Sequence, residues 1–127
     1  MNKILKIFIG GSFAILIFSL AAFGQKGETV EKRLKFARGK SSVTVKGKIS
    51  DRLTTHLYLV KARAGQTLTV VFSSPRKDID VCVFFPDNRD FCGQRKYSFK
   101  LETDGDYEIL VDGHRENIPY TLTVSVK

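Results

Sequence analysis

The segment DGDYEILVDGHRENIPYTLTVSV, residues 104–126, contains two runs in which apolar and polar residues alternate. Apolar residues occupy every second position of both runs: Tyr107, Ile109, Val111, Tyr120, Leu122, Val124 and Val126. Because successive side chains of a β-strand point to opposite faces, each run predicts a strand with one buried and one solvated face. The Asp112-Gly113 pair between the runs is typical of a turn. The segment therefore predicts two half-buried strands joined by a loop.

The same period of two recurs upstream, in residues 42–49, 67–72 and 97–102. Residues 56–62 and 80–85 are apolar on both faces, which favours central strands. With a first strand near Leu34–Phe36, about eight short strands predict an all-β fold: an antiparallel, jelly-roll-like β-sandwich. We expect nine residues to face its core: Val45, Leu68, Val70, Phe99, Leu101, Ile109, Val111, Leu122 and Val124.

The first residues follow a different pattern. Lys3 and Lys6 precede an apolar stretch, and the small residues of Ala22-Phe23-Gly24 place a cleavage site before Gln25. This three-part layout predicts a secretory signal peptide, because the apolar run is short for a ~20-residue membrane helix. We therefore expect a signal peptide over 1–24, a linker over 25–33 and the sandwich over 34–127. The mature protein would be periplasmic or secreted, without a membrane anchor.

Charge restricts the classes of partner. Removing Lys3 and Lys6 from the 21 basic residues leaves 19, against 13 acidic ones, so the mature chain carries +6. Such a charge favours anionic partners. The basic residues are spread along the chain without a dense run, which argues against nucleic acid as the partner.

Two cysteines, Cys82 and Cys92, flank the turn-rich stretch 86–90. A hairpin folded about Asp87 would set them nearly opposite each other. In an oxidising compartment such a pair usually forms a disulfide. The alternative is a reactive or metal-binding thiol, for which no histidine lies nearby in sequence.

Residues with catalytic or metal-binding chemistry are few. The chain has two histidines, His56 and His114, and contains no nucleophile elbow, metal-ligand pair or glycine-rich phosphate loop. Two acidic clusters are comparable with calcium sites: Asp78 with Asp80, and Glu102 with Asp104 and Asp106. Neither follows the order of an EF-hand loop, and turns explain the Asp-Gly pairs. We therefore predict a protein that is not an enzyme and has no cofactor or metal.

The predicted loops carry an uneven charge, with six cations: Arg76, Lys77, Arg89, Arg95, Lys96 and Arg115. Scattered loop cations usually serve solubility. They also suit recognition, because loops on a rigid sandwich carry binding residues and arginine pairs with carboxylates through two hydrogen bonds.

Several segments resemble bacterial pre-peptidase C-terminal domains. Residues 40–47 and 58–70 resemble the first half of such domains, and residues 104–111 and 120–124 resemble the second half. The most specific parts are Ala64-Gly65-Gln66 and Gly105-Asp106-Tyr107. The resemblance covers about residues 34–127 and implies a β-sandwich without catalytic activity of its own, of the kind that usually follows a secreted protease or hydrolase.

A copy of this size with a signal peptide and no enzyme domain is similar to the bacterial inhibitors of g-type lysozyme. That resemblance implies a periplasmic protein whose loops block the lysozyme cleft, with an arginine-rich segment that ends in a tyrosine before the final strand. Arg115 and Tyr120 map onto that segment. The candidate binding residues are therefore Arg115, Tyr120, His114 and Arg89, at one end of the sandwich.

The alternative function is that of a pre-peptidase C-terminal-type binding module for polysaccharide or another extracellular polymer. Such a module would present an exposed aromatic platform on one sheet face. The chain has no tryptophan, and only Tyr58 and Phe84 are apolar candidates for an outer face.

The cleavage site gives a first test. Protein recovered from the periplasm or medium should begin at Gln25 or within a residue or two of it. Intact-mass measurement checks this expectation. A chain that retains residues 1–20 in the membrane fraction would contradict it.

Overall fold

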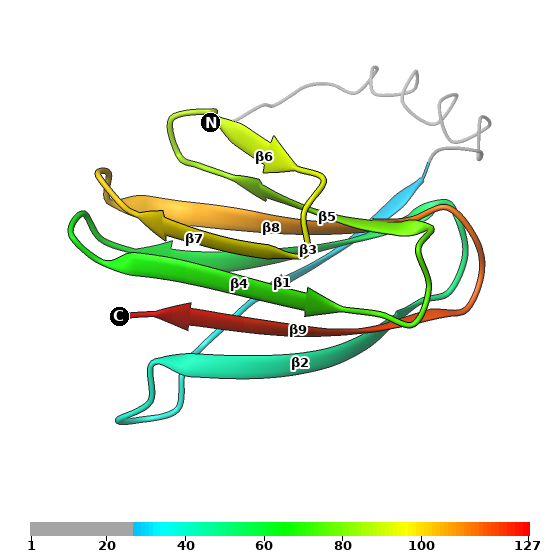
Figure 1. Ribbon diagram of the computed structural model, residues 1–127, viewed down its shortest axis with the longest axis horizontal. Coiled ribbons are helices and arrows are strands. Elements are labelled where there is room, and N and C mark those ends of the chain that lie inside the picture. The colour runs from blue at the N-terminus through cyan, green and yellow to red at the C-terminus, as the bar shows by residue number, and fades with distance from the viewer. Residues whose placement is uncertain (1–26) are drawn as a thin grey trace, which may run out of the picture.

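The computed structural model describes residues 27–127, which form two facing β-sheets (Figure 1). The strands of this part are β1 (Glu28–Arg33), β2 (Ser42–Ile49), β3 (Thr54–Ala62), β4 (Thr67–Ser73), β5 (Ile79–Phe84), β6 (Asp90–Cys92), β7 (Lys96–Lys100), β8 (Gly105–Gly113) and β9 (Ile118–Val126). Over these residues the chain forms no helix that is long and apolar enough to cross a membrane. The signal peptide predicted over 1–24 lies outside the described residues.

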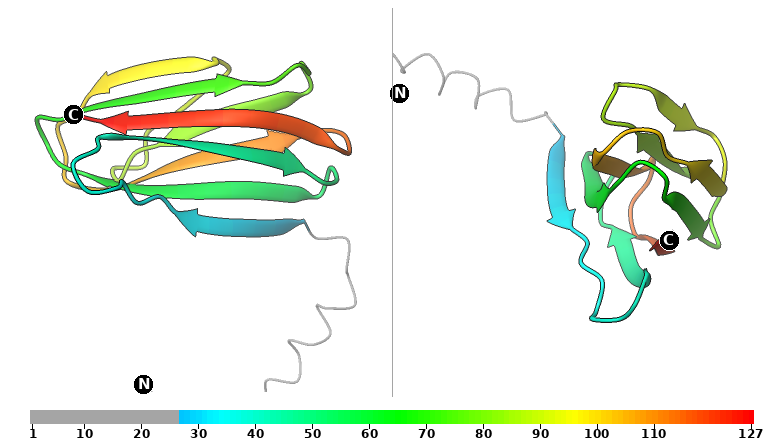
Figure 2. Two further views of the ribbon diagram at one scale, coloured as in Figure 1. Left: turned by 90° about the horizontal axis from the view of Figure 1, so that it is seen from below. Right: turned by 90° about the vertical axis from the view of Figure 1, so that its left-hand side faces the viewer.

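The strands form a five-stranded sheet in the order β1-β3-β8-β5-β6 and a four-stranded sheet in the order β2-β9-β4-β7. Every pairing is antiparallel except that of β1 with β3. The end-on view in Figure 2 shows the two layers. The predicted all-β sandwich is confirmed, because each alternating run supplies one apolar face to the space between the sheets.

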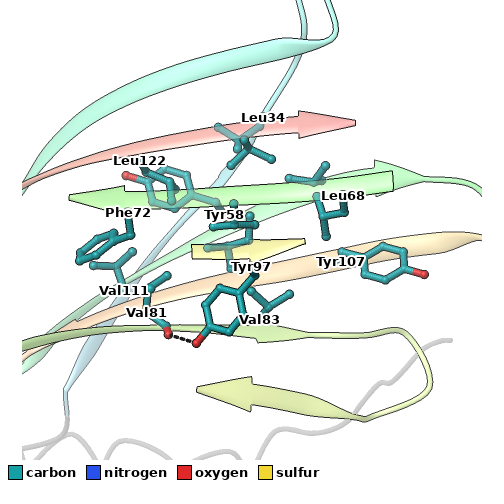
Figure 3. Packing of buried hydrophobic residues seen from close by; sticks show 14 of the residues in the cluster. Leu34, Tyr58, Leu68, Phe72, Val81, Val83, Tyr97, Tyr107, Val111 and Leu122 are labelled. Atoms are coloured by element: carbon teal, nitrogen blue, oxygen red, sulfur yellow. Dashed lines mark hydrogen bonds between the residues drawn. The ribbon is translucent and has the colours of Figure 1, made fainter. Parts of the chain in front are cut away.

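The core lies between the sheets (Figure 3). Seven of the nine residues predicted to face it are buried: Leu68, Val70, Leu101, Ile109, Val111, Leu122 and Val124. Val45 and Phe99 are partly buried and pack against the same cluster. The hydrophobic alternation therefore predicted the phase of these strands correctly.

The first strand differs from the prediction. Residues 28–33, predicted as part of a linker, form β1, whereas Leu34 follows the strand and buries its side chain. All six residues of β1 are exposed, so the strand has no apolar alternation to reveal it. Backbone pairing along the edge of β3 holds it in place. Two hydrogen bonds from Arg33 to Asp106, of 2.9 and 2.8 Å, add a side-chain link to β8.

The predicted disulfide is confirmed. Cys82 of β5 and Cys92 of β6 lie directly opposite each other in the hairpin and are bonded. Asn88 adopts the left-handed conformation, with φ of 72°, at the hairpin turn. Asparagine tolerates this conformation better than most residues. The disulfide thus fastens the short edge strand β6 to its sheet.

Tyrosines join the two sheets through the core. The hydroxyl of Tyr120 on β9 hydrogen-bonds with Tyr58 and, at 2.6 Å, with Nδ1 of His56, both on β3 of the other sheet. In the same way Tyr97 of β7 donates to the carbonyl of Val81 on β5 at 3.1 Å (Figure 3). A buried hydroxyl that loses its partner costs ~1–3 kcal/mol. These bonds therefore favour one placement of one sheet on the other.

Gly47 of β2 makes room for the Tyr120 ring. A Cβ atom at position 47 would lie 2.5 Å from both Cζ and the hydroxyl oxygen of Tyr120. The ring is held at its far end by hydrogen bonds, so it cannot give way freely. A residue larger than glycine must therefore displace the strand or break the contact between the sheets.

We expect Gly47→Ala to lower the free energy of unfolding by ~1–3 kcal/mol, the usual cost of overpacking a core. In a Tyr120→Leu background the same change should be neutral or stabilising, because the clash is gone and alanine suits a strand interior better than glycine. Urea unfolding of the four members of this cycle measures both values. An equal cost in the two backgrounds would show that Tyr120 is not the obstacle.

Candidate functional site

The strand register separates the loops into two groups at opposite ends of the sandwich. Ile79 at the start of β5 pairs with Gly113 at the end of β8, whereas Phe84 at the other end of β5 pairs with Glu108. The β8–β9 loop with Arg115 is therefore at one end, on the right in Figure 1, and the β5–β6 loop is at the other, on the left. Arg115 and Arg89 were predicted to share one end, and the structure does not bring them together. The register of β5 with β8 separates them.

The end that carries Arg115 contains an open hollow of about 980 Å³. The loops β2–β3, β4–β5 and β8–β9 line it with Asp51, Arg52, Leu53, Arg76, His114, Arg115 and Glu116. We call this feature the end hollow. Three of its residues are arginines, and Leu53 is 46% exposed. The hollow thus combines cationic side chains with an accessible apolar one.

Side chains brace the loops around the end hollow. Oδ1 of Asp51 accepts hydrogen bonds from the Leu53 backbone at 2.8 Å and from Thr54 Oγ1 at 3.0 Å. Ser74 donates to the carbonyl of Pro119 at 2.7 Å, which ties the β4–β5 loop to β9. Arg95 donates to the carbonyl of Arg76 at 2.8 Å. Loops held in this way lose less conformational entropy when a partner binds.

The Arg115 side chain extends from these braced loops. It is 73% exposed, and its Nε atom lies 3.2 Å from Oδ2 of Asp78. The same oxygen accepts a hydrogen bond from Arg76 at 2.8 Å. Asp78 therefore orients two guanidinium groups at once. Among residues 27–127 Asp78 is the one ion-pair partner of Arg115. With 73% of its side chain exposed, Arg115 remains accessible to a partner.

His114 lies beside Arg115 and pairs with an acid. Its Nε2 atom is 3.1 Å from Oδ2 of Asp80, and its backbone N–H donates to the carbonyl of Asp78. The hydrogen bond with Asp80 raises the pKa of His114 above its ordinary value, and the negative charges of Asp80, Asp112 and Asp78 act in the same direction. His114 therefore adds a positive charge to the end hollow over a wider pH range than an isolated histidine does.

Tyr120 and Arg89, the other two candidate binding residues, do not line the end hollow. Tyr120 is 3% exposed, so it belongs to the core and has no surface to offer to a partner. Burial raises its pKa and keeps its hydroxyl protonated. Arg89 hydrogen-bonds through Nε to both carboxylate oxygens of Asp87, and its guanidinium lies 4.7 Å from the centre of the Phe85 ring. It stiffens its own hairpin.

An aromatic binding platform is not formed by the two residues predicted for it. Tyr58 was expected on an outer face but is buried, since its hydroxyl bonds with Tyr120 between the sheets. Phe84 is partly buried on the outer face of the five-stranded sheet. The apolar run 56–62 hid the direction of Tyr58, because both faces of β3 carry apolar residues.

Four of the five acidic residues compared with calcium sites have protein partners. Asp106 pairs with Arg33, and Asp104 accepts a hydrogen bond from the Ala64 backbone at 2.8 Å. Asp78 and Asp80 pair with Arg115 and His114 in the end hollow. No group of three or more potential metal ligands occurs within residues 27–127.

The two sheets form a small β-sandwich of the type found in lysozyme inhibitors and pre-peptidase C-terminal domains. The solved structure of Aeromonas hydrophila PliG, a periplasmic inhibitor of g-type lysozyme, superposes with a TM-score of 0.69 and 25% identity, covering 80% of this chain and 99% of that one. Salmonella Typhimurium PliG superposes with a TM-score of 0.62 and 22% identity, over 80% of this chain and 100% of that one.

The pre-peptidase C-terminal domain of collagenase from Bacillus anthracis shares the fold more distantly. It superposes with a TM-score of 0.55 and 16% identity, over 81% of this chain and 98% of that domain. No family model and no curated protein matches the sequence. The fold is therefore that of these structures. Because the sequence identities are low, the binding residues have to be argued from the site itself.

The sequence prediction overlooked Arg52 and Leu53, which line the end hollow. The composition of Ser50-Asp51-Arg52 predicts only a turn. The sequence signal that could have identified Arg52 and Leu53 is Asp51, which caps the turn and leaves the two following side chains free to project. Their closeness to Arg115 depends on the positions of β2 and β9 in the four-stranded sheet, which local patterns do not specify.

The pairing of His114 with Asp80 gives a test by NMR titration. We expect His114 to titrate above 6.5, the ordinary histidine value, and Asp80→Asn to move its pKa down towards 6.5. Because the folded-state pKa is raised, the stabilisation is complete below the unfolded value and is lost as pH rises through the folded one. His56, whose pKa burial lowers, is the internal control and should not respond to Asp80→Asn. A wild-type His114 value at or below 6.5 would contradict the pairing.

Proposed function

We propose that this protein is exported to the periplasm and inhibits a g-type lysozyme through the end hollow. The observation that carries the proposal is the likeness to Aeromonas hydrophila PliG, which spans 99% of that inhibitor. In this chain the exposed Arg115, paired with Asp78, stands on braced loops. The signal peptide predicted over residues 1–24 supports the location. A protein partner is favoured over a small ligand, because the hollow is wide and open.

Arg115 is the proposed contact with the enzyme. The cleft of a glycosidase carries carboxylates that act on the substrate. A guanidinium can form two parallel hydrogen bonds with a carboxylate, and the terminal amino groups of Arg115 are available for this. Asp78 holds the Nε side of the group, so the arginine approaches the cleft already oriented. Insertion of this side chain would occupy the space that the polysaccharide substrate needs.

The residues around Arg115 supply the rest of the interface. Leu53 offers an exposed apolar side chain on the neighbouring loop, and Arg52 and Arg76 add positive charge. Interfaces of this kind derive most of their affinity from a few central residues within a ring of weaker contacts. In this proposal Arg115 is the central residue, and Leu53 excludes water beside it.

Inhibition assays with two matched variants test the proposal. Arg115→Ala should weaken binding to a g-type lysozyme by ~2–5 kcal/mol, the usual cost of truncating one partner of a desolvated charge pair. Arg89→Ala removes the same charge at the opposite end and should leave inhibition unchanged. Both variants should keep nearly the thermal stability of the wild type, because both side chains are exposed.

The assay uses purified protein beginning at Gln25 and compares g-type with c-type and i-type lysozymes. Inhibition of the g-type enzyme alone, lost only with Arg115→Ala, supports the proposal. If the wild-type protein binds no g-type lysozyme at micromolar concentrations, the proposal is wrong. Equal effects of Arg115→Ala and Arg89→Ala would show that net charge rather than the end hollow is responsible.

A further inference from the structure

The outer face of the four-stranded sheet has an unusual composition. Strand alternation turns every second residue of β2, β9, β4 and β7 to solvent, and Figure 2 (left) looks onto this face. Serine and threonine side chains fill its middle. Lysines stand on its two edge strands: Lys46 and Lys48 on β2, and Lys96 and Lys100 on β7. These four strands turn no aspartate or glutamate to this face. We call it the lysine-edged face.

The register sorts the hydroxyl groups into rows across the sheet. One row runs from Ser42 through Ser125 and Thr69 to Ser98, and the next contains Thr44, Thr123, Val71 and Lys96. The hydroxyl oxygens of Thr44 and Thr123 are 3.0 Å apart and share a hydrogen bond. Since neighbouring strands lie ~4.8 Å apart, the two edge strands are ~14 Å apart. The face is therefore a hydroxyl-rich surface with lysines on its two edge strands.

The opposite outer face, in contrast, carries acids. On the five-stranded sheet Asp80, Asp106, Glu108 and Asp112 project outward from β5 and β8. Lysines placed only for solubility would be interspersed with acids on both faces. On the five-stranded sheet the two signs are mixed, since Lys61 lies opposite Asp106 and Arg33 pairs with the same acid. The lysine-edged face has no such acids, so it presents an uncompensated positive field to solvent.

We propose that the lysine-edged face binds an acidic polysaccharide, a glycan chain that carries carboxylate groups. Ammonium groups pair with the carboxylates along both edges. The serine and threonine hydroxyls both donate and accept hydrogen bonds, which matches the hydroxyl groups of sugar rings. A sheet face fits an extended polymer better than a small ligand, which requires a concave pocket.

Two other anionic partners fit the face less well. Single-stranded nucleic acid binds through aromatic or arginine side chains on which its bases stack, and these strands turn neither to the face. A membrane surface requires apolar side chains that enter it, and Val71 is the one large apolar side chain exposed there among the described residues. The lysine-edged face is also separate from the end hollow, so a bound glycan would leave Arg115 accessible.

Binding to polygalacturonate tests the proposal, with highly methyl-esterified polygalacturonate as the uncharged control polymer. The wild-type protein, purified as the cell produces it, should bind the first polymer and not the second. The variant with Lys46, Lys48, Lys96 and Lys100 changed to Gln should bind about tenfold or more weakly, because the charge contacts dominate the affinity for a polyanion.

Matched variants separate a site from general charge. Changing Arg38, Lys40, Lys61 and Arg63 to Gln removes the same charge from other surfaces and should leave binding within about twofold of the wild type. Thr123→Val removes one central hydroxyl without changing charge and should weaken binding by about threefold. This single variant also keeps the test decisive if the fourfold lysine variant folds poorly, as thermal unfolding would reveal.

Three results would overturn the proposal. One is equal weakening by the two fourfold variants, which would mean that total charge decides. Another is binding to single-stranded DNA or to vesicles containing anionic lipid that is as tight as binding to polygalacturonate. The third is equal binding to the esterified polymer.

Discussion

The hydrogen bonds of the Tyr120 hydroxyl with His56 and Tyr58 are the contact on which the arrangement of the two sheets depends most directly. Tyr120 belongs to β9, one of the two central strands of the four-stranded sheet, and its partners belong to β3 of the other sheet. A hydroxyl buried in an apolar core is costly unless it is bonded, so only placements that satisfy it are stable. Apolar packing alone would tolerate a small slide of one sheet over the other. The hydrogen-bonded Tyr120 does not tolerate such a slide.

This constraint extends to the candidate binding site. β9 begins two residues before Tyr120, directly after the loop that carries Arg115. At the other end of that loop Gly113 fits closely against Ile49 and Ile118, where an added Cβ would lie 3.1 and 3.2 Å from their side chains. Both ends of the β8–β9 loop are thus anchored in the core. Asp78 then orients Arg115 from the neighbouring loop, so the exposed guanidinium stands on well-packed residues.

The sequence predicted the structure correctly where a single local pattern determined it. Alternation located the strands around Leu68, Ile109 and Leu122, because one face of each is buried and the other is solvated. Turn chemistry between Cys82 and Cys92 predicted the hairpin that brings them together. The all-polar strand β1 escaped prediction for the same reason, since an edge strand held by its backbone needs no apolar pattern.

Long-range order was not accessible from local patterns. Arg89 and Arg115 are both loop arginines in the sequence, and only the pairing of β5 with β8 shows that they lie at opposite ends. Tyr58 lies in a run that is apolar on both faces, so its direction was ambiguous until β3 was placed beside β8. The grouping of Leu53 with Arg115 likewise depends on the strand order β2-β9.

Strand order also explains why lysines that are scattered along the chain come together on one face. Lys46 and Lys100 are more than fifty positions apart in sequence, yet β2 and β7 are the two edges of one sheet. The acids of β5 and β8 are central in the other sheet and turn away from these lysines. A surface of uniform sign attracts polyanions over a distance of about one Debye length, ~8–10 Å at physiological salt. In the proposed binding mode the protein would approach an anionic polymer with the four-stranded sheet foremost, and the loops at the ends of the sandwich would stay free to meet a second partner.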